Sequence, residues 1–132
     1  MRTFLLFLWR FRFSLLLAGL VFYLSVMRIP SPVRVLFFPG ADKVIHLILY
    51  FLLALALMFE AVLPLGTKRR PLSAFALVFL LPAFYGALIE LLQQFCFPPR
   101  TCNWLDWVFD ALGALIAFLA YSFFFSRRSS NA

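Results

Sequence analysis

The chain has 132 residues, of which 65% are hydrophobic and only 13% are charged, and its mean hydropathy is +1.01. A soluble domain this small is mostly surface and typically carries about 25% charged residues. Twelve basic and five acidic side chains, 17 in all, cannot shield 19 phenylalanines from water. The composition therefore excludes a soluble enzyme, a disordered tail and a secreted disulfide scaffold. It predicts a protein whose solvent is the lipid bilayer.

The net charge of +7 would raise the question of nucleic acid in a soluble protein. Here the basic residues lie at the ends of apolar runs and do not follow one stripe. That placement is typical of membrane anchors and topology signals. We therefore expect the bilayer, and no nucleic acid, as the partner.

Four apolar runs have the length that a helix needs to cross a hydrocarbon core, roughly 20 residues. Backbone groups in lipid must be paired within the segment, so each run is predicted to be a helix, and none alternates like a barrel strand. Prolines interrupt the chain between the runs. In chain order, the predicted helices cover residues 13–27, 44–63, 72–95 and 105–125. The chain 1–132 is predicted to be a single all-α transmembrane domain.

The first run has a basic start, as a signal peptide does. Residues 25–30 contain no A-x-A-like cleavage site, so we expect an uncleaved helix.

Loop charges predict the orientation, because basic residues favour the cytoplasmic side. Three arginines precede the first run, Lys68–Arg70 lie between the second and third, and Arg127 and Arg128 follow the fourth. These are eight basic residues on one side, against four on the other. We therefore expect both termini in the cytoplasm.

Polar residues in or beside apolar runs are costly in lipid and usually face a protein interior or water. On the second predicted helix, Asp42, His46 and Tyr50 are four residues apart and share one face, with Lys43 beside them. The predicted topology puts this face in the outer half of the membrane.

The third and fourth predicted helices bring further polar residues to the same depth. Glu90 and Gln93 share a face near the outer end of the third helix, while Asp106 and Asp110 open the fourth. One site near the outer surface explains this convergence. Its candidate binding residues are Asp42, Lys43, His46, Tyr50, Glu90, Gln93, Arg100, Asp106 and Asp110.

Structural roles compete with this interpretation. Asp42 and Asp106 could cap helices, and Gln93 could hydrogen-bond between helices. A structural ion-pair network would also give the same pattern. Glu60, near the inner end of the second helix, is interpreted as an interfacial carboxylate or a partner of Lys68–Arg70.

The motifs, taken in order, resemble those of the VanZ-like family. Asp42-Lys43-x-x-His46-x-x-x-Tyr50 is similar to the first family signature. Glu90-x-x-Gln93-x-Phe95, Pro98-Pro99-Arg100 and Asp106-x-x-x-Asp110-x-x-Gly113 are similar to the second. The resemblance extends over residues 40–119.

Two positions depart from the family pattern. The family usually has Asn in place of Asp110 and commonly Pro-Gly-Arg in place of Pro98-Pro99-Arg100. We therefore expect Asp110 to be a tolerant position. The resemblance implies a small, multi-pass protein of the bacterial inner membrane with a link to the cell envelope, because the family takes its name from a protein associated with teicoplanin resistance. It implies no established reaction.

Two classes of function stay open at this stage. In the first, Arg100 and Lys43 hold an anionic envelope lipid, a cell-wall precursor or a glycopeptide-related ligand. In the second, the protein is an intramembrane enzyme in which His46 or Glu90 is the general base, Arg100 clamps an oxyanion or phosphate, and Asp106 orients them.

Other functions have less support in the sequence. One histidine with carboxylates is a poor ligand supply, so we expect no metal and no cofactor. Transport would require oligomers, and the oligomeric state is not indicated.

Cys96 and Cys102 flank Arg100 in the predicted outer loop. A disulfide there would form in an oxidising compartment and would stiffen the loop. Two free thiols are the alternative, because spacing alone does not fix the Cα geometry.

Overall fold

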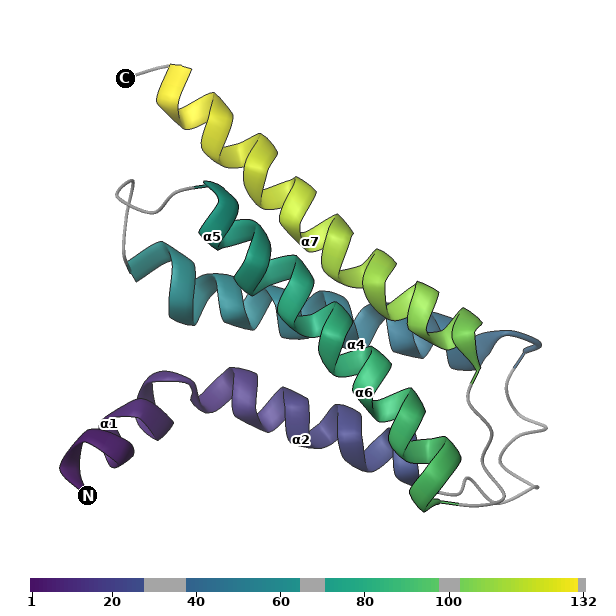
Figure 1. Ribbon diagram of the computed structural model, residues 1–132. Helices are drawn as coiled ribbons and strands as arrows, with labels where there is room; N and C mark the ends of the chain where they lie inside the picture. The colour runs from purple at the N-terminus through teal and green to yellow at the C-terminus, as the bar shows by residue number, and fades with distance from the viewer. Residues whose placement is uncertain (28–37, 65–70, 98–102, 131–132) are drawn as a thin grey trace.

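The computed structural model describes residues 1–27, 38–64, 71–97 and 103–130, with the side chains of Pro71 and of residues 125–130 left aside (Figure 1). The regular structure in these ranges is entirely helical, as predicted. The elements are α1 (Arg2–Arg10), α2 (Arg12–Val26), α4 (Ala41–Leu57), η1 (Met58–Val62), α5 (Pro71–Phe75), η3 (Ala76–Leu80), α6 (Leu81–Cys96) and α7 (Trp104–Ser130).

Three continuous helices are long and apolar enough to cross a membrane: Ala41–Val62, Leu72–Cys96 and Trp104–Phe124. They correspond to the predicted helices 44–63, 72–95 and 105–125. The predicted helix 13–27 corresponds to α2, but a further helix, α1, precedes it at an angle of 72°. The described residues therefore provide three candidate spans, or four if α1 and α2 count as one bent span.

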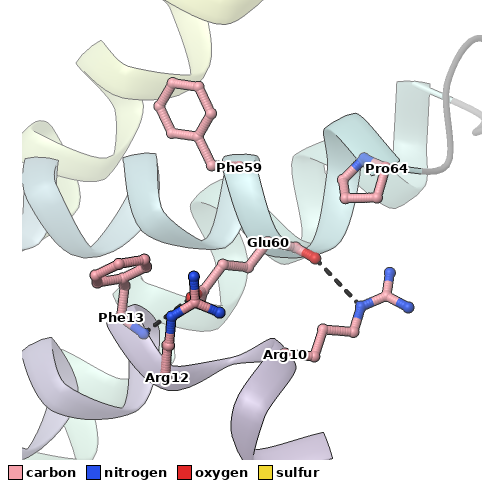
Figure 2. A pocket seen from close by; sticks show the side chains of 6 residues that line it. All are labelled: Arg10, Arg12, Phe13, Phe59, Glu60 and Pro64. Carbon is pink, nitrogen blue, oxygen red and sulfur yellow. Dashed lines mark hydrogen bonds between the residues drawn. The ribbon is translucent and has the colours of Figure 1, made fainter. Parts of the chain in front are cut away.

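The bend between α1 and α2 is stabilised by a residue distant in sequence. The first backbone N–H groups of a helix have no partner within the helix. The N–H groups of Phe13 and Ser14 donate to the two carboxylate oxygens of Glu60, at 2.9 and 3.0 Å. Arg10 Nε also donates to the Glu60 carbonyl oxygen at 3.3 Å (Figure 2). Glu60 is only 8% exposed and is a buried cap for α2, a role that the sequence analysis did not assign to it.

Two short π-helical segments interrupt the long helices, and each precedes a proline. η3 ends two residues before Pro82, and η1 ends two residues before Pro64. Proline lacks the N–H that would donate to the carbonyl four residues earlier, and its ring crowds that carbonyl. A wider local turn relieves this conflict and lets the helix continue.

The helix pair α4 and η1 lies at the centre of the bundle. α7 packs along α4, α6 packs on α7 and α4, and α2 packs on α4 and α6 (Figure 1). Small residues make the closest contacts: Ala54, Ala114 and Ala117 are fully buried. Such residues let helices approach closely where lipid supplies no hydrophobic drive. α2 has no substantial contact with α7, so it is peripheral to the other three.

Gly113 is the point of closest approach between α7 and α4. A Cβ at this position would overlap the Leu47 carbonyl oxygen and would lie 3.0 Å from the Phe51 nitrogen. Only glycine therefore allows the backbones to meet here. The contact lies one turn from the polar residues of both helices, and so it fixes their mutual distance.

Candidate functional site

The polar residues of three helices gather at one end of the bundle. α4 and α7 begin at this end, and α6 finishes there (Figure 1). α1 begins, η1 finishes and α7 finishes at the opposite end. The polar cluster comprises Asp42, Lys43, His46, Tyr50, Glu90, Asn103, Asp106 and Asp110.

The shortest side-chain contact in the polar cluster joins α4 to α7. His46 Nδ1 lies 2.8 Å from Asp110 Oδ1. Asp110 is 1% exposed, whereas His46 is only partly buried. The buried carboxylate therefore fixes the orientation of an imidazole whose other nitrogen remains available.

α6 approaches this pair at Gly86. A Cβ there would lie 2.7 Å from Asp110 Oδ2 and 3.3 Å from the Tyr50 hydroxyl. The absence of a side chain at Gly86 therefore makes room for both groups. Tyr50 is completely buried, and its hydroxyl forms no hydrogen bond of acceptable geometry with the residues described.

A second chain of contacts links α4, α7 and α6 through Asn103. Lys43 Nζ lies 3.2 Å from Asp42 Oδ2 and 3.4 Å from Asp106 Oδ1. Asn103 Nδ2 donates to Asp106 Oδ1 at 3.0 Å. The Asn103 backbone N–H donates to Glu90 Oε2 at 2.8 Å. The carboxylate of α6 is thereby tied to the start of α7.

One carboxylate oxygen of Glu90 has no hydrogen-bond partner among the described residues. Glu90 is 3% exposed, and its Oε1 is buried without a hydrogen-bond partner in the described part of the chain. Buried polar atoms are nearly always paired, so an orphaned oxygen calls for a partner from outside the described residues.

Gln93 has a different role from the one predicted. Its Nε2 donates to the Ser25 carbonyl oxygen at 2.8 Å, and the contact is buried. This bond holds α6 against α2, on the side of α6 that faces the peripheral helix. The alternative interpretation, a hydrogen bond between helices, therefore describes Gln93 better than a binding role.

Neither Asp42 nor Asp106 caps its helix, the alternative role considered for them. Asp42 does not cap α4, because that helix begins earlier and its N-cap is Gly40, with φ of 88°. Asn103 accepts the Leu105 N–H at 3.2 Å, so it caps α7 in place of Asp106. Asp106 contacts Lys43 and Asn103, whereas it is Asp110 that orients His46. Asp110 is therefore more central than its departure from the family pattern suggested.

Some predicted residues lie outside the described ranges. These include Arg100, Cys102 and Lys68–Arg70. Cys96 is described, and its thiol is free and exposed, as the alternative of two free thiols expects. A contact between Glu90 and Arg100 stays a prediction. Within the described ranges, no group of three or more His, Cys, Asp or Glu residues is placed to hold a metal ion.

The arrangement offers one ammonium group, one imidazole oriented by a carboxylate, and two buried oxygen atoms, Tyr50 Oη and Glu90 Oε1, for which the described residues supply no hydrogen-bond partner. Such a set can bind a polar ligand that both donates and accepts hydrogen bonds, and it can transfer a proton through His46. Comparison of this chain with protein-family models, with curated proteins and with solved structures finds no match.

Proposed function

We propose that this chain is a VanZ-like protein of the bacterial inner membrane that binds the anionic headgroup of an envelope lipid or lipid-linked cell-wall precursor. In this proposal α1 and α2 form one bent span, so the chain crosses four times and both termini are cytoplasmic. The polar cluster then lies near the outer face. A glycopeptide-related ligand, suggested by the family resemblance, would reach the same face.

The proposal depends mainly on the convergence of buried polar groups from α4, α6 and α7. Removing one partner of a buried pair leaves a costly unpaired charge, so membrane proteins seldom keep such groups without a use. Glu90 Oε1 can accept a hydrogen bond from a ligand hydroxyl, and the Tyr50 hydroxyl can donate one. A glycerol or sugar headgroup offers both kinds of partner.

The anionic part of the ligand requires positive charge. Lys43 is only partly buried at the edge of the polar cluster and can turn an N–H toward a phosphate. Arg100, four residues after the end of α6 in the sequence, would add a guanidinium fork that matches phosphate oxygens. The carboxylates Asp42 and Asp106 would hold Lys43 in place.

Lipid co-purification tests this function. The protein is purified in a mild detergent, and the retained lipids are identified by mass spectrometry for the wild type, Lys43→Gln and Arg100→Ala. Arg2→Gln, at the opposite end of the bundle, is the matched control for loss of one positive charge. We expect both test variants to retain one anionic lipid fewer per protein than the wild type and the control. Equal retention by all four proteins would contradict the proposal.

The His46–Asp110 pair favours a second candidate, an intramembrane enzyme with His46 as general base. A carboxylate that orients an imidazole is the usual arrangement for proton transfer. Here Asp110 would stabilise the protonated imidazole, and Lys43 or Arg100 would stabilise the developing negative charge. A product formed from a lipid-linked precursor by the wild type, and absent with His46→Gln despite normal lipid retention, would favour the enzyme over the binding protein.

A further inference from the structure

A cavity extends from the α1–α2 bend to the middle of the bundle, where Tyr85, one of its lining residues, packs beside Tyr50 of the polar cluster. Its volume is about 430 Å³, within the range of roughly 300–1,000 Å³ that ligand pockets occupy. Its walls come from the α1–α2 bend, from α4 with η1, and from η3 with α6. Phe7, Phe11, Leu53, Leu57 and Leu81 make most of the lining apolar. We call it the apolar cavity.

A second cavity, of about 400 Å³, lies at the same bend (Figure 2). Arg10, Arg12 and Glu60 line it, and we call it the basic cavity. Neighbouring residues of the bend line different cavities: Phe11 and Ser14 line the apolar cavity, whereas Arg12 and Phe13 line the basic one. The two cavities therefore border the same short stretch of backbone.

The basic cavity carries positive charge that an anionic ligand can contact. Besides cation–π contacts with neighbouring aromatic rings, each guanidinium donates one N–H to a backbone carbonyl: Arg10 Nε to that of Glu60 and Arg12 Nη1 to that of Trp9. Arginine has five N–H donors, and neither residue forms an ion pair within the described ranges. Both oxygens of the Glu60 carboxylate are already occupied by backbone N–H groups. Two guanidinium groups and one carboxylate leave a net positive site.

Ser14 provides an independent indication of a ligand. It is 5% exposed, lines the apolar cavity, and its hydroxyl has no hydrogen-bond partner in the described ranges. An unpaired hydroxyl within an apolar lining is unfavourable unless something enters to accept its hydrogen bond. Ser14 follows Arg12 by two residues on the bend that borders both cavities.

We propose that the apolar and basic cavities together form a phospholipid site, distinct from the polar cluster. One acyl chain fills the apolar cavity, an ester oxygen accepts the Ser14 hydroxyl, and the phosphate of an anionic headgroup contacts Arg10 and Arg12. The charge of the basic cavity selects an anionic phospholipid over a zwitterionic one. The α1–α2 bend, fixed by Glu60, holds the arginines at the mouth of the apolar cavity.

The test uses the full chain in bilayer discs that contain equal parts of phosphatidylglycerol and phosphatidylcholine. The protein is then extracted in mild detergent, and the lipids retained are quantified by native mass spectrometry. The variants are Arg10→Gln/Arg12→Gln, Arg10→Lys/Arg12→Lys and Ala18→Phe, whose larger side chain would fill the apolar cavity. Arg2→Gln removes a charge from the same helix outside both cavities and is the matched control.

We expect the wild type and Arg2→Gln to retain phosphatidylglycerol preferentially. The glutamine pair should lower that preference by about 10- to 30-fold, because each basic residue near a lipid surface contributes about 1 kcal/mol. The lysine pair should keep the preference, and Ala18→Phe should reduce both lipids. Equal retention of the two lipids by the wild type, or an unchanged preference in the glutamine pair, would overturn the proposal. If the glutamine pair fails to fold, an undiminished retention of both lipids by Ala18→Phe would overturn it.

Discussion

Replacing Gly113 with alanine tests the packing that brings the polar cluster together. The new Cβ would overlap the Leu47 carbonyl oxygen and would lie 3.0 Å from the Phe51 nitrogen. Both atoms belong to backbone, which cannot rotate away as a side chain can. α7 and α4 must therefore move apart over this contact.

The cost of that separation can be estimated from the structure. Overpacking a well-packed core costs typically 1–3 kcal/mol, and the rigid backbone at this contact argues for the upper half of that range. An alanine at an unobstructed helix position has the opposite effect, a gain of up to about 1 kcal/mol. Gly19 in α2 is such a position, because a Cβ there meets nothing within 4 Å. Gly19→Ala is therefore the matched control.

The assay is thermal unfolding of purified wild type, Gly113→Ala and Gly19→Ala in the same detergent. For a chain of this length, a loss of 2–3 kcal/mol should lower Tm by roughly 6–12 °C, while Gly19→Ala should leave it unchanged or raise it slightly. His46 and Asp110, now 2.8 Å apart, would also be drawn apart. A Gly113→Ala protein with the Tm of the Gly19→Ala protein would refute the close approach of α7 to α4.

Three further predictions concern other parts of the chain. Glu60→Ala should lower the free energy of unfolding by about 3 kcal/mol, because two backbone N–H groups lose a charged acceptor. Glu60→Gln should lower that free energy by about half as much. Unfolding in detergent measures both changes. Reporter fusions after residues 70 and 128 should report the cytoplasm and a fusion near residue 99 the outside; a cytoplasmic signal at residue 99 would put the polar cluster on the wrong face. Thiol labelling of Cys96 in membranes should be complete without reductant, because its thiol is free and exposed; labelling that increases after reduction would show the disulfide with Cys102 instead.

The sequence predicted the helical spans well because lipid imposes a strong and local constraint. Backbone groups must be paired within each apolar run, so length and composition alone locate α4, α6 and α7 to within a few residues. The helix at residues 2–10 was not predicted, because the bend at Phe11 contains neither proline nor glycine. It depends on a cap from Glu60, 46 positions beyond Ser14. Such a tertiary contact leaves no local signal in the sequence.

The candidate site was predicted in outline but not in its pairings. Helical spacing brought Asp42, His46 and Tyr50 onto one face, and topology brought α6 and α7 to the same end. Spacing could not show that Asp110, and not Asp106, contacts His46, because that depends on the rotation of α7 set by Gly113. The same limit applies to Gln93, whose partner on α2 is determined by packing between distant segments.

The central claim is that side chains from three helices form one ligand site. A double-mutant cycle on Glu90 and His46, read as the amount of anionic lipid retained, tests it most directly. These residues belong to different helices, and within the described residues each is hydrogen-bonded to a different residue, His46 to Asp110 and Glu90 to Asn103. We predict that Glu90→Gln and His46→Gln each reduce lipid retention. The double variant should retain about as much lipid as whichever single variant retains less. Strictly additive losses, or single variants that retain lipid like the wild type, would show separate structural contacts and contradict the claim.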